Sequence, residues 1–140
     1  MTPTIALTRD IATCRALRRV VFIDEQGVSE ADEVDDLDGD ALHLLAVVAG
    51  RPVGTARLLV VGDTVKVGRV CVLAEQRGTG FGAALMRAAV EQARALPGIS
   101  RVKLGAQTHA LGFYERLGFA AYGPEFDDAG IPHRLMVLGL

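Results

Sequence analysis

The sequence has little of several features that would place it in a special class. Only two cysteines, Cys14 and Cys71, occur among 140 residues, which excludes a disulfide-stabilised scaffold. No apolar run reaches the roughly 18 residues that a transmembrane helix needs. The N-terminus lacks the basic segment followed by an apolar segment that marks a signal peptide. We therefore expect a cytoplasmic protein that has no membrane partner.

The chain also lacks a strong excess of charge of either sign. Its formal net charge is -2, whereas nucleic-acid-binding domains usually carry a clear basic excess. We therefore expect no nucleic-acid partner. The length fits one domain, residues 1–140, since domains usually hold about 100–150 residues. A chain of this size buries enough surface to fold without a disulfide or a metal ion.

The small net charge hides an uneven distribution along the chain. Residues 24–40 carry nine acidic side chains and no basic one. These side chains are Asp24, Glu25, Glu30, Asp32, Glu33, Asp35, Asp36, Asp38 and Asp40. Such a run is typical of a solvated loop. It also fits an acidic rim that attracts a cationic substrate, and the sequence leaves both interpretations open.

Hydrophobic periodicity and turn residues predict strands that alternate with helices. The expected strands cover residues 4–8, 42–48, 52–61, 64–73, 99–106, 119–122 and 134–138. The expected helices cover residues 10–26, 78–96 and 108–117, and the acidic run is expected to be a loop, with at most a short helical turn. The second, third and fourth strands form an antiparallel meander joined by tight turns. This order predicts an α+β, or mixed α/β, fold.

A glycine-rich turn lies between an expected strand and an expected helix, with the sequence Arg77-Gly78-Thr79-Gly80-Phe81-Gly82. Glycine lets the backbone approach a ligand closely. The helix N-terminus behind the turn presents unpaired N–H groups and the positive end of the helix dipole. Arg77 adds a fixed positive charge. The turn therefore predicts a binding site for a pyrophosphate.

Two other phosphate-binding motifs do not fit this turn. A P-loop needs Lys followed by Ser or Thr after its last glycine, but Ala83 and Ala84 follow Gly82. A dinucleotide-binding turn needs an acidic residue about 20 positions further on. No Asp or Glu lies between Glu91 and Glu115, so neither a nicotinamide nor a flavin is expected.

Two segments resemble motifs of the GNAT acyltransferases. Arg77-x-x-Gly80-x-Gly82 resembles the R/Q-x-x-G-x-G/A signature with which that family binds the pyrophosphate of acetyl-CoA. Residues 113–119, FYERLGF, resemble the family's F-Y-x-x-x-G-F motif. The resemblance extends over nearly all of residues 4–138. It implies the GNAT fold, a mixed central sheet of about six to seven strands with a splayed parallel pair, flanked by about four helices.

Within this family the chain is similar to the small ElaA/YjcF-type members. Those members also carry an E-Q pair in the first helix, a D-rich loop and a late G-I-P-H segment. Here these features are Glu25-Gln26, residues 32–38 and residues 130–133. The resemblance implies transfer of an acetyl group from acetyl-CoA to a primary amine, directly and in a ternary complex.

The resemblance also assigns roles to residues. The cofactor would bind the turn at residues 77–82, and its pantetheine arm would pair like an added strand with the backbone of Val70, Cys71 and Val72. Tyr114 matches the family's tyrosine near the thiolate, so the resemblance makes it a neighbour of the cofactor. It is also a candidate acid, because a phenol of pKa about 10 can protonate a thiolate. The histidines and cysteines lack ligand spacing, so no metal is expected.

The group that removes the proton from the amine stays open. Glu25 and His133 are the main candidates, His43 is a further one, and a water chain is an alternative. The acidic run favours a small cationic acceptor, and exposed sheet edges favour a homodimer in this fold. Two other functions remain open. One is a sensor that binds acyl-CoA without turnover. The other is an acyltransferase like the acyl-homoserine-lactone synthases, because Arg18-x-x-x-Phe22 and the spaced acidic residues after it resemble part of those enzymes.

Overall fold

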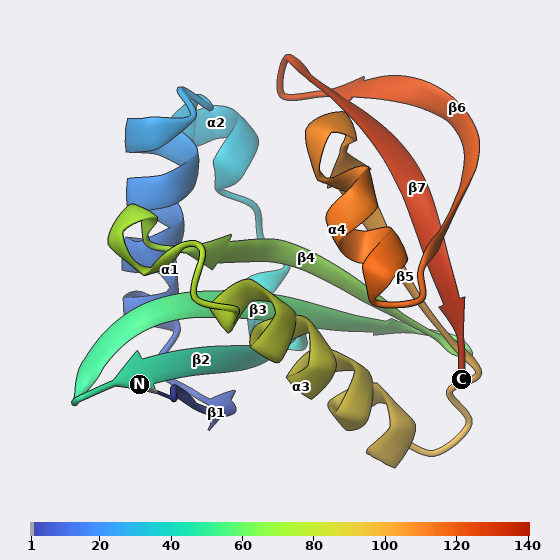
Figure 1. The fold of residues 1–140 in the computed structure, drawn as a ribbon, viewed down its shortest axis with the longest axis horizontal. Helices are drawn as coiled ribbons and strands as arrows, with labels where there is room; N and C mark the ends of the chain where they lie inside the picture. The colour runs from blue at the N-terminus through green and yellow to red at the C-terminus, as the bar shows by residue number, and fades with distance from the viewer. Residues whose placement is uncertain (1) are drawn as a thin grey trace.

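The strands form one seven-stranded mixed sheet in the order β1-β2-β3-β4-β5-β7-β6 (Figure 1). The structure is a computed structural model that describes residues 2–140. Its strands are β1 (Thr4–Thr8), β2 (Leu42–Val48), β3 (Arg51–Val61), β4 (Thr64–Val72), β5 (Arg101–Gln107), β6 (Ala120–Asp128) and β7 (Ile131–Gly139). Every neighbouring pair is antiparallel except β4 and β5, which run parallel. The expected mixed sheet with one parallel pair is confirmed.

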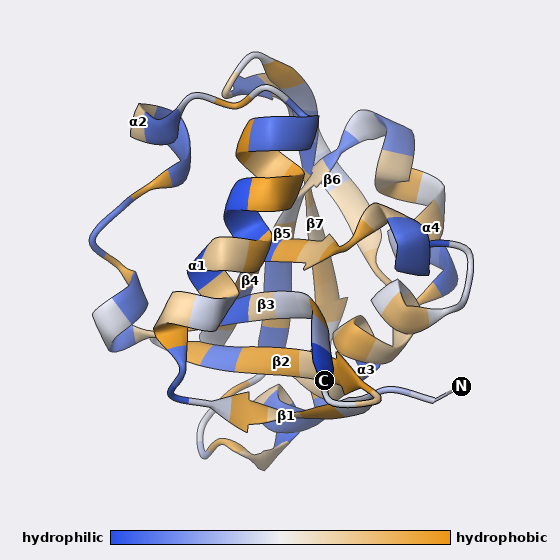
Figure 2. Cartoon of the chain, turned by 90° about the vertical axis from the view of Figure 1, so that its left-hand side faces the viewer, coloured by the Kyte–Doolittle hydropathy of each residue, from blue (hydrophilic) through white to orange (hydrophobic). Residues whose placement is uncertain are grey.

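Helices cover both faces of this sheet. They are α1 (Ile11–Arg18), the π-helical segment η1 (Arg19–Glu25), α2 (Glu30–Glu33), α3 (Phe81–Ala95) and α4 (Leu111–Arg116). Figure 2 shows the strands between α1 on one side and α3 on the other. Successive strand residues point to opposite faces, so Leu44 and Ala46 pack in the cluster that contains Leu85 of α3, whereas Leu45 packs against the cluster that contains Leu17 of α1. Within residues 2–140, no helix is long and apolar enough to cross a membrane.

The first helix changes from α-helical to π-helical geometry half-way along its length. It begins as expected after Asp10, whose carboxylate accepts the backbone N–H of Thr13 at 3.1 Å. After Arg18 it continues as the π-helical η1 rather than as an α-helix. Gly27, with φ +73°, follows its end. The expected helix is therefore present, but its second half has a geometry that occurs often at functional sites.

Several expected boundaries were wrong. The helix after the glycine-rich turn begins at Phe81 rather than at Gly78, because Gly78 and Gly80 have φ values of +79° and +85°, outside the helical region. The expected strand at residues 119–122 continues to Asp128 through a break in register between Tyr122 and Phe126. Only residues 111–116 of the expected third helix form an α-helix, after a 3₁₀ turn, η4 (Thr108–Ala110).

The parallel strands β4 and β5 pair only along their first residues. Thr64–Lys66 pairs with Arg101–Lys103, and beyond these three pairs the two strands separate. β4 remains paired with β3 as far as Val72, and β5 remains paired with β7 as far as Gln107. The splay predicted from the resemblance is confirmed, and it leaves two backbone edges without a partner inside the sheet.

The acidic run is tied to the sheet by buried ion pairs. We call these residues the arginine–carboxylate cluster: Arg18, Arg57, Arg69, Glu33, Asp35 and Asp38. Arg18 donates to both oxygens of Asp38, at 2.9 and 2.8 Å, and both side chains are almost completely buried. Arg57 donates to both oxygens of Asp35, at 2.8 and 2.9 Å. For these three acids the solvated-loop interpretation was wrong, because arginines from distant parts of the chain neutralise them.

The cluster also holds a bulge in β4. Two residues of β4, Arg69 and Val70, lie opposite one residue of β3, since Thr55 pairs with Cys71 and Arg57 with Gly68. Arg69 has φ +51°, in the left-handed region that non-glycine residues rarely adopt. Its guanidinium donates to the backbone carbonyl of Glu33 at 2.9 Å and to the carboxylate of Asp35 at 3.3 Å. These contacts stabilise the bulge at the start of the segment assigned to the cofactor.

Candidate active site

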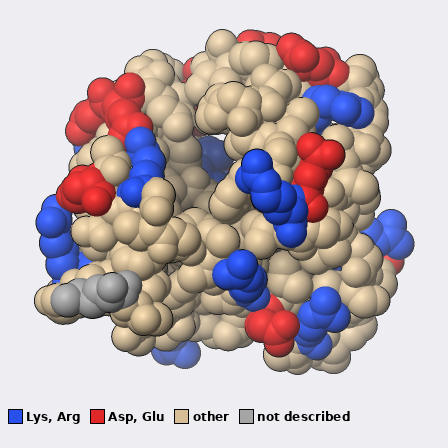
Figure 3. All heavy atoms as spheres, viewed as in Figure 1, with Lys and Arg blue, Asp and Glu red and all other residues tan. Residues whose placement is uncertain are grey.

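A cavity of about 320 Å³ opens where β4 and β5 separate. Its lining comes from η1, α2, β4, β5, α4 and the β6–β7 hairpin. Figure 3 shows the hollow on this face of the molecule, between the part that carries α1 and α2 and the part that carries α4. Its size lies at the lower end of the range for small-molecule sites, so it suits a small ligand.

The β4 edge of the splay offers free backbone groups. The N–H of Leu73 donates to Val53 of β3 at 2.9 Å. Because successive N–H groups of a strand point to opposite sides, the N–H of Val72 points into the splay. The carbonyl of Val72 points the same way and accepts Nε of Arg77 at 3.1 Å. The N–H of Val72 is therefore available to a strand-like arm with amide groups, whereas its carbonyl is occupied by Arg77.

The glycine-rich turn presents open backbone at the start of α3. A Cβ atom placed on Gly78 or Gly80 would meet nothing within 4 Å, so this side of the turn is free to receive a ligand. Gly80 precedes α3 without a side-chain cap, and the first N–H groups of a helix lack intrahelical partners. A Cβ atom placed on Gly82 would lie 3.5 Å from the ring of Phe113. The turn and the helix end fit a pyrophosphate.

Arg77 is engaged by Glu25 rather than free beside the turn. Its Nη2 donates to Oε1 of Glu25 at 2.9 Å, and its Nη1 donates to the other carboxylate oxygen. The guanidinium lowers the pKa of the Glu25 carboxyl below its ordinary value. A carboxylate with a lowered pKa is a weaker proton acceptor. The ion pair joins the end of η1 to the glycine-rich turn. It therefore connects Glu25, a candidate base, to the segment expected to bind the cofactor.

Tyr114, which the resemblance assigns to the neighbourhood of the thiolate, lines the cavity from α4. Its ring makes edge-to-face contacts with Phe113 and Phe119, at centroid distances of 5.0 and 6.1 Å. Burial raises the pKa of its hydroxyl to about 12. The phenol is therefore protonated at neutral pH and can act as a hydrogen-bond donor in the cavity.

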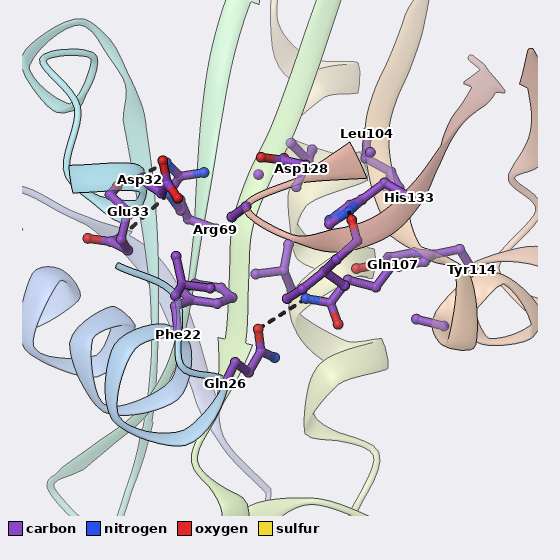
Figure 4. Close-up of a pocket in the computed structure, with 18 residues that line it drawn as sticks. Phe22, Gln26, Asp32, Glu33, Arg69, Leu104, Gln107, Tyr114, Asp128 and His133 are labelled. Carbon is purple, nitrogen blue, oxygen red and sulfur yellow. Dashed lines mark hydrogen bonds and ion pairs between the residues drawn. The ribbon is translucent and has the colours of Figure 1, made fainter. Parts of the chain in front are cut away.

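His133 lines the same cavity from β7 and is nine-tenths buried (Figure 4). Its Nδ1 lies 2.7 Å from the carbonyl of Ile131. A carbonyl oxygen only accepts, so Nδ1 carries the proton and Nε2 of the neutral ring keeps a free lone pair. Phe126 stacks on the ring at 5.8 Å. No other residue of the described chain, 2–140, hydrogen-bonds Nε2, which leaves this nitrogen for a ligand.

The other titratable candidates lie elsewhere. The Nε2 atom of His43, on β2, lies 2.9 Å from the carbonyl of Asp38. His43 does not line this cavity. The Nε2 atom of His109 lies 2.6 Å from Oε1 of Gln107. Burial raises the pKa of Cys71 to about 12, which keeps its thiol protonated and inert. In the part of the chain that the structure describes, no group of three or more His, Cys, Asp and Glu could hold a metal ion.

Sequence reasoning missed several residues that line the cavity. Gln107 of β5 donates to the Oε1 atom of Gln26 at 3.0 Å, and this bond crosses the open end of the splay (Figure 4). Asp128 at the end of β6 and Phe22 of η1 also line the cavity. Asp32 of α2, which the sequence had placed in the possible acidic rim, lines it too. Asp128 lies five positions before His133, so the G-I-P-H segment could have pointed to Asp128 as a site residue. For Gln107 the only sequence signal was its position at the end of an expected strand.

Comparison with known proteins identifies close relatives. The family model for the acetyltransferase (GNAT) domain matches residues 20–140. The N-acetyltransferase YjcF of Bacillus subtilis, named as uncharacterized, is 38% identical over 122 residues, which are 86% of this chain and 86% of YjcF. The protein ElaA of Escherichia coli is 36% identical over 121 residues, 84% of this chain and 79% of ElaA.

A solved structure shows the same fold. The crystal structure of an acyl-CoA N-acyltransferase from Pseudomonas aeruginosa superposes with a TM-score of 0.87 at 32% identity, covering 97% of this chain and 99% of that one. Together with YjcF and ElaA, it confirms the fold that the two sequence motifs predicted and the ElaA/YjcF type that the E-Q pair, the D-rich loop and the G-I-P-H segment predicted.

Proposed function

Because the chain belongs to the GNAT acetyltransferase family, we propose that it transfers the acetyl group of acetyl-CoA to a primary amine, directly within a ternary complex. One observation carries the proposal. The cavity at the splay contains a protonated phenol, Tyr114, and an imidazole lone pair, Nε2 of His133, beside an unpaired strand edge. Acetyl-CoA, when bound, supplies a thioester whose carbonyl carbon is open to attack by an amine.

The binding of the cofactor is divided between two backbone segments. The N–H groups at Gly80–Gly82 and the dipole of α3 hold the negative pyrophosphate. The edge of β4 at Val70–Val72 pairs with the amides of the pantetheine arm, which fills the position of a missing strand. The N–H of Val72, which points into the splay, donates to the thioester oxygen as negative charge develops there.

The proton balance uses two side chains. Nε2 of His133 accepts a proton from the acceptor ammonium, and the neutral amine then forms the N–C bond. The C–S bond breaks, and the hydroxyl of Tyr114 donates its proton to the departing sulfur. The new amide nitrogen then releases its second proton, which restores the phenol of Tyr114, and His133 returns the first proton to solvent. The raised pKa of Tyr114 keeps the hydroxyl protonated up to the moment of transfer.

His133 is favoured over Glu25 as the base by their hydrogen bonds. Both carboxylate oxygens of Glu25 accept from Arg77, and this contact lowers the pKa of Glu25. Nε2 of His133 faces the cavity, and the contact between Nδ1 and Ile131 fixes the tautomer that a base requires. Stacking against Phe126 fixes the plane of the ring.

The test is thiol release from acetyl-CoA across a panel of primary amines, with three proteins. The wild type should release thiol in proportion to acetylated product. His133→Gln should lower kcat/KM for the amine by roughly 100- to 10,000-fold, whereas Glu25→Gln should stay within about tenfold of wild type. A loss in Glu25→Gln as large as that in His133→Gln would contradict the assignment. Tight binding of acetyl-CoA without turnover of any amine would contradict the enzyme and favour the sensor.

A further inference from the structure

The carboxylates that line the cavity differ in whether they are neutralised. Three of them line it: Asp32, Glu33 and Asp128. Glu33 is buried and accepts from Arg18 at 3.1 Å, so its charge belongs to the arginine–carboxylate cluster. Asp32 and Asp128 are exposed at the cavity and form no ion pair with any of residues 2–140. The cavity therefore keeps two uncompensated negative charges.

These two carboxylates come from opposite sides of the splay. Asp32 belongs to α2, and Asp128 ends β6 where the chain turns into β7. Figure 1 shows α2 and the tip of the β6–β7 hairpin on either side of the opening. Figure 4 shows both side chains at the cavity together with His133, whose unpartnered Nε2 marks where a proton can be taken. A ligand between these groups meets negative charge from two directions.

The reacting nitrogen must be neutral when it attacks, and a nearby carboxylate would favour its protonated form. The charges of Asp32 and Asp128 therefore suit a cationic group that keeps its proton throughout the reaction better than they suit the attacking nitrogen. We propose that the acceptor is a diamine-like molecule, whose second ammonium group is held by Asp32 and Asp128 while its first amine lies at Nε2 of His133.

The opposite kind of acceptor, an amine that carries a carboxylate, lacks a free partner in the cavity. Arg69 is the one basic Lys or Arg side chain among the described residues that line it. Its guanidinium already lies against Glu33 and Asp35, with contacts of 3.5 and 3.3 Å between charged atoms. An acceptor carboxylate would have to displace Asp35 and would meet Asp32 and Asp128. The cavity therefore selects positive charge beside Asp32 and Asp128.

The proposal rests on the proposed acetyl transfer, so its test includes a measurement without turnover. The probes are putrescine, a diamine, and butylamine, which has the same carbon chain but only one amine. The ratio of kcat/KM for putrescine to that for butylamine measures the contribution of the second charge. We expect the wild type to favour putrescine. Asp32→Asn and Asp128→Asn should each lower the ratio roughly two- to fivefold, as expected for exposed ion pairs, and the double variant by roughly tenfold.

Asp36→Asn is the matched control, since Asp36 is an exposed member of the same acidic run that does not line the cavity. It should leave the ratio unchanged. Raising the salt concentration should lower the wild-type ratio toward that of the double variant. A wild type that uses butylamine as well as putrescine, or an Asp36→Asn protein that loses the preference equally, would overturn the proposal.

Calorimetric titration of putrescine into the protein loaded with CoA separates this proposal from the proposed function. Binding by the wild type that the double variant loses, without turnover of either amine, would overturn acetyl transfer and retain the cationic site. Turnover of butylamine combined with no measurable putrescine binding would overturn the cationic site and retain acetyl transfer.

Discussion

The arginine–carboxylate cluster should control the stability of the molecule through Asp38. This carboxylate is 1% exposed and accepts from Arg18, Arg15 and Arg57. The change Asp38→Asn keeps the size of the side chain but removes its charge, which leaves two buried guanidinium groups with less compensation. Breaking a buried ion pair in this way costs about 3–5 kcal/mol.

The expected shift in melting temperature follows from the length of the chain. For 140 residues, the entropy of unfolding is about 0.3 kcal/mol/K near the transition, so the cost corresponds to a fall in Tm of roughly 10–17 °C. Thermal unfolding followed by circular dichroism at pH 7 measures it. Asp40→Asn is the control, because Asp40 is exposed, and an exposed substitution should change the free energy of unfolding by no more than about 0.5 kcal/mol.

The same variant has a defined dependence on pH. The hydrogen bonds from Arg18 hold the pKa of Asp38 well below its usual range. A lowered pKa contributes stability above the unfolded value of about 3.9, and this stability is lost as the pH falls toward the folded value. The Tm difference between wild type and Asp38→Asn should therefore be constant near neutral pH and shrink below about pH 4. A fall in Tm no larger than that of Asp40→Asn, or a difference that does not shrink in acid, would refute the reasoning.

Three further predictions concern the site. Tyr114→Phe should lower kcat by about 100-fold while the KM for acetyl-CoA changes little, and steady-state thiol release measures both; an unchanged kcat would rule out its role as the acid. Gly80→Ala places a side chain at φ +85°, which costs about 1–2 kcal/mol, so the turn should relax away from the conformation that receives the pyrophosphate; calorimetry should then show weaker acetyl-CoA binding, and Gly50→Ala in a distant turn should not weaken it. Glu25→Gln frees Arg77 for the pyrophosphate, so acetyl-CoA should bind at least as tightly as to the wild type; weaker binding would show that the ion pair shapes the turn.

Local chemistry made much of the fold predictable. The bounds of β1 and β2 match the expected strands, and the apolar run of β2 ends before a turn that contains Gly50. The start of the first helix was predicted from Asp10, whose side chain caps it. The change to a π-helix after Arg18 was not visible, since the apolar stripe through Leu17 and Val21 fits either helix.

The sequence also indicated where a candidate site would lie, but not the partners of its charged groups. The glycine-rich turn and Tyr114 are local signals, and the structure places both at the splay or beside it. The charge of Arg77 was expected at the pyrophosphate, yet it is paired with Glu25, 52 positions away in the sequence. The acidic run shows the same limitation, because Asp38 is neutralised by residues as distant as Arg15, 23 positions away in the sequence. Such pairs depend on tertiary folding and leave no periodic pattern.

The short seam between β4 and β5 has a mechanical consequence. Only three residue pairs, Thr64–Lys66 with Arg101–Lys103, hydrogen-bond the two halves of the sheet to each other. A pantetheine arm in the splay would extend that seam and act as a temporary structural strand. The amides along the free edge of β4, such as that of Val72, should then exchange with solvent slowly only while the cofactor is bound. The substrate would thus be, for the length of one turnover, part of the framework that positions it.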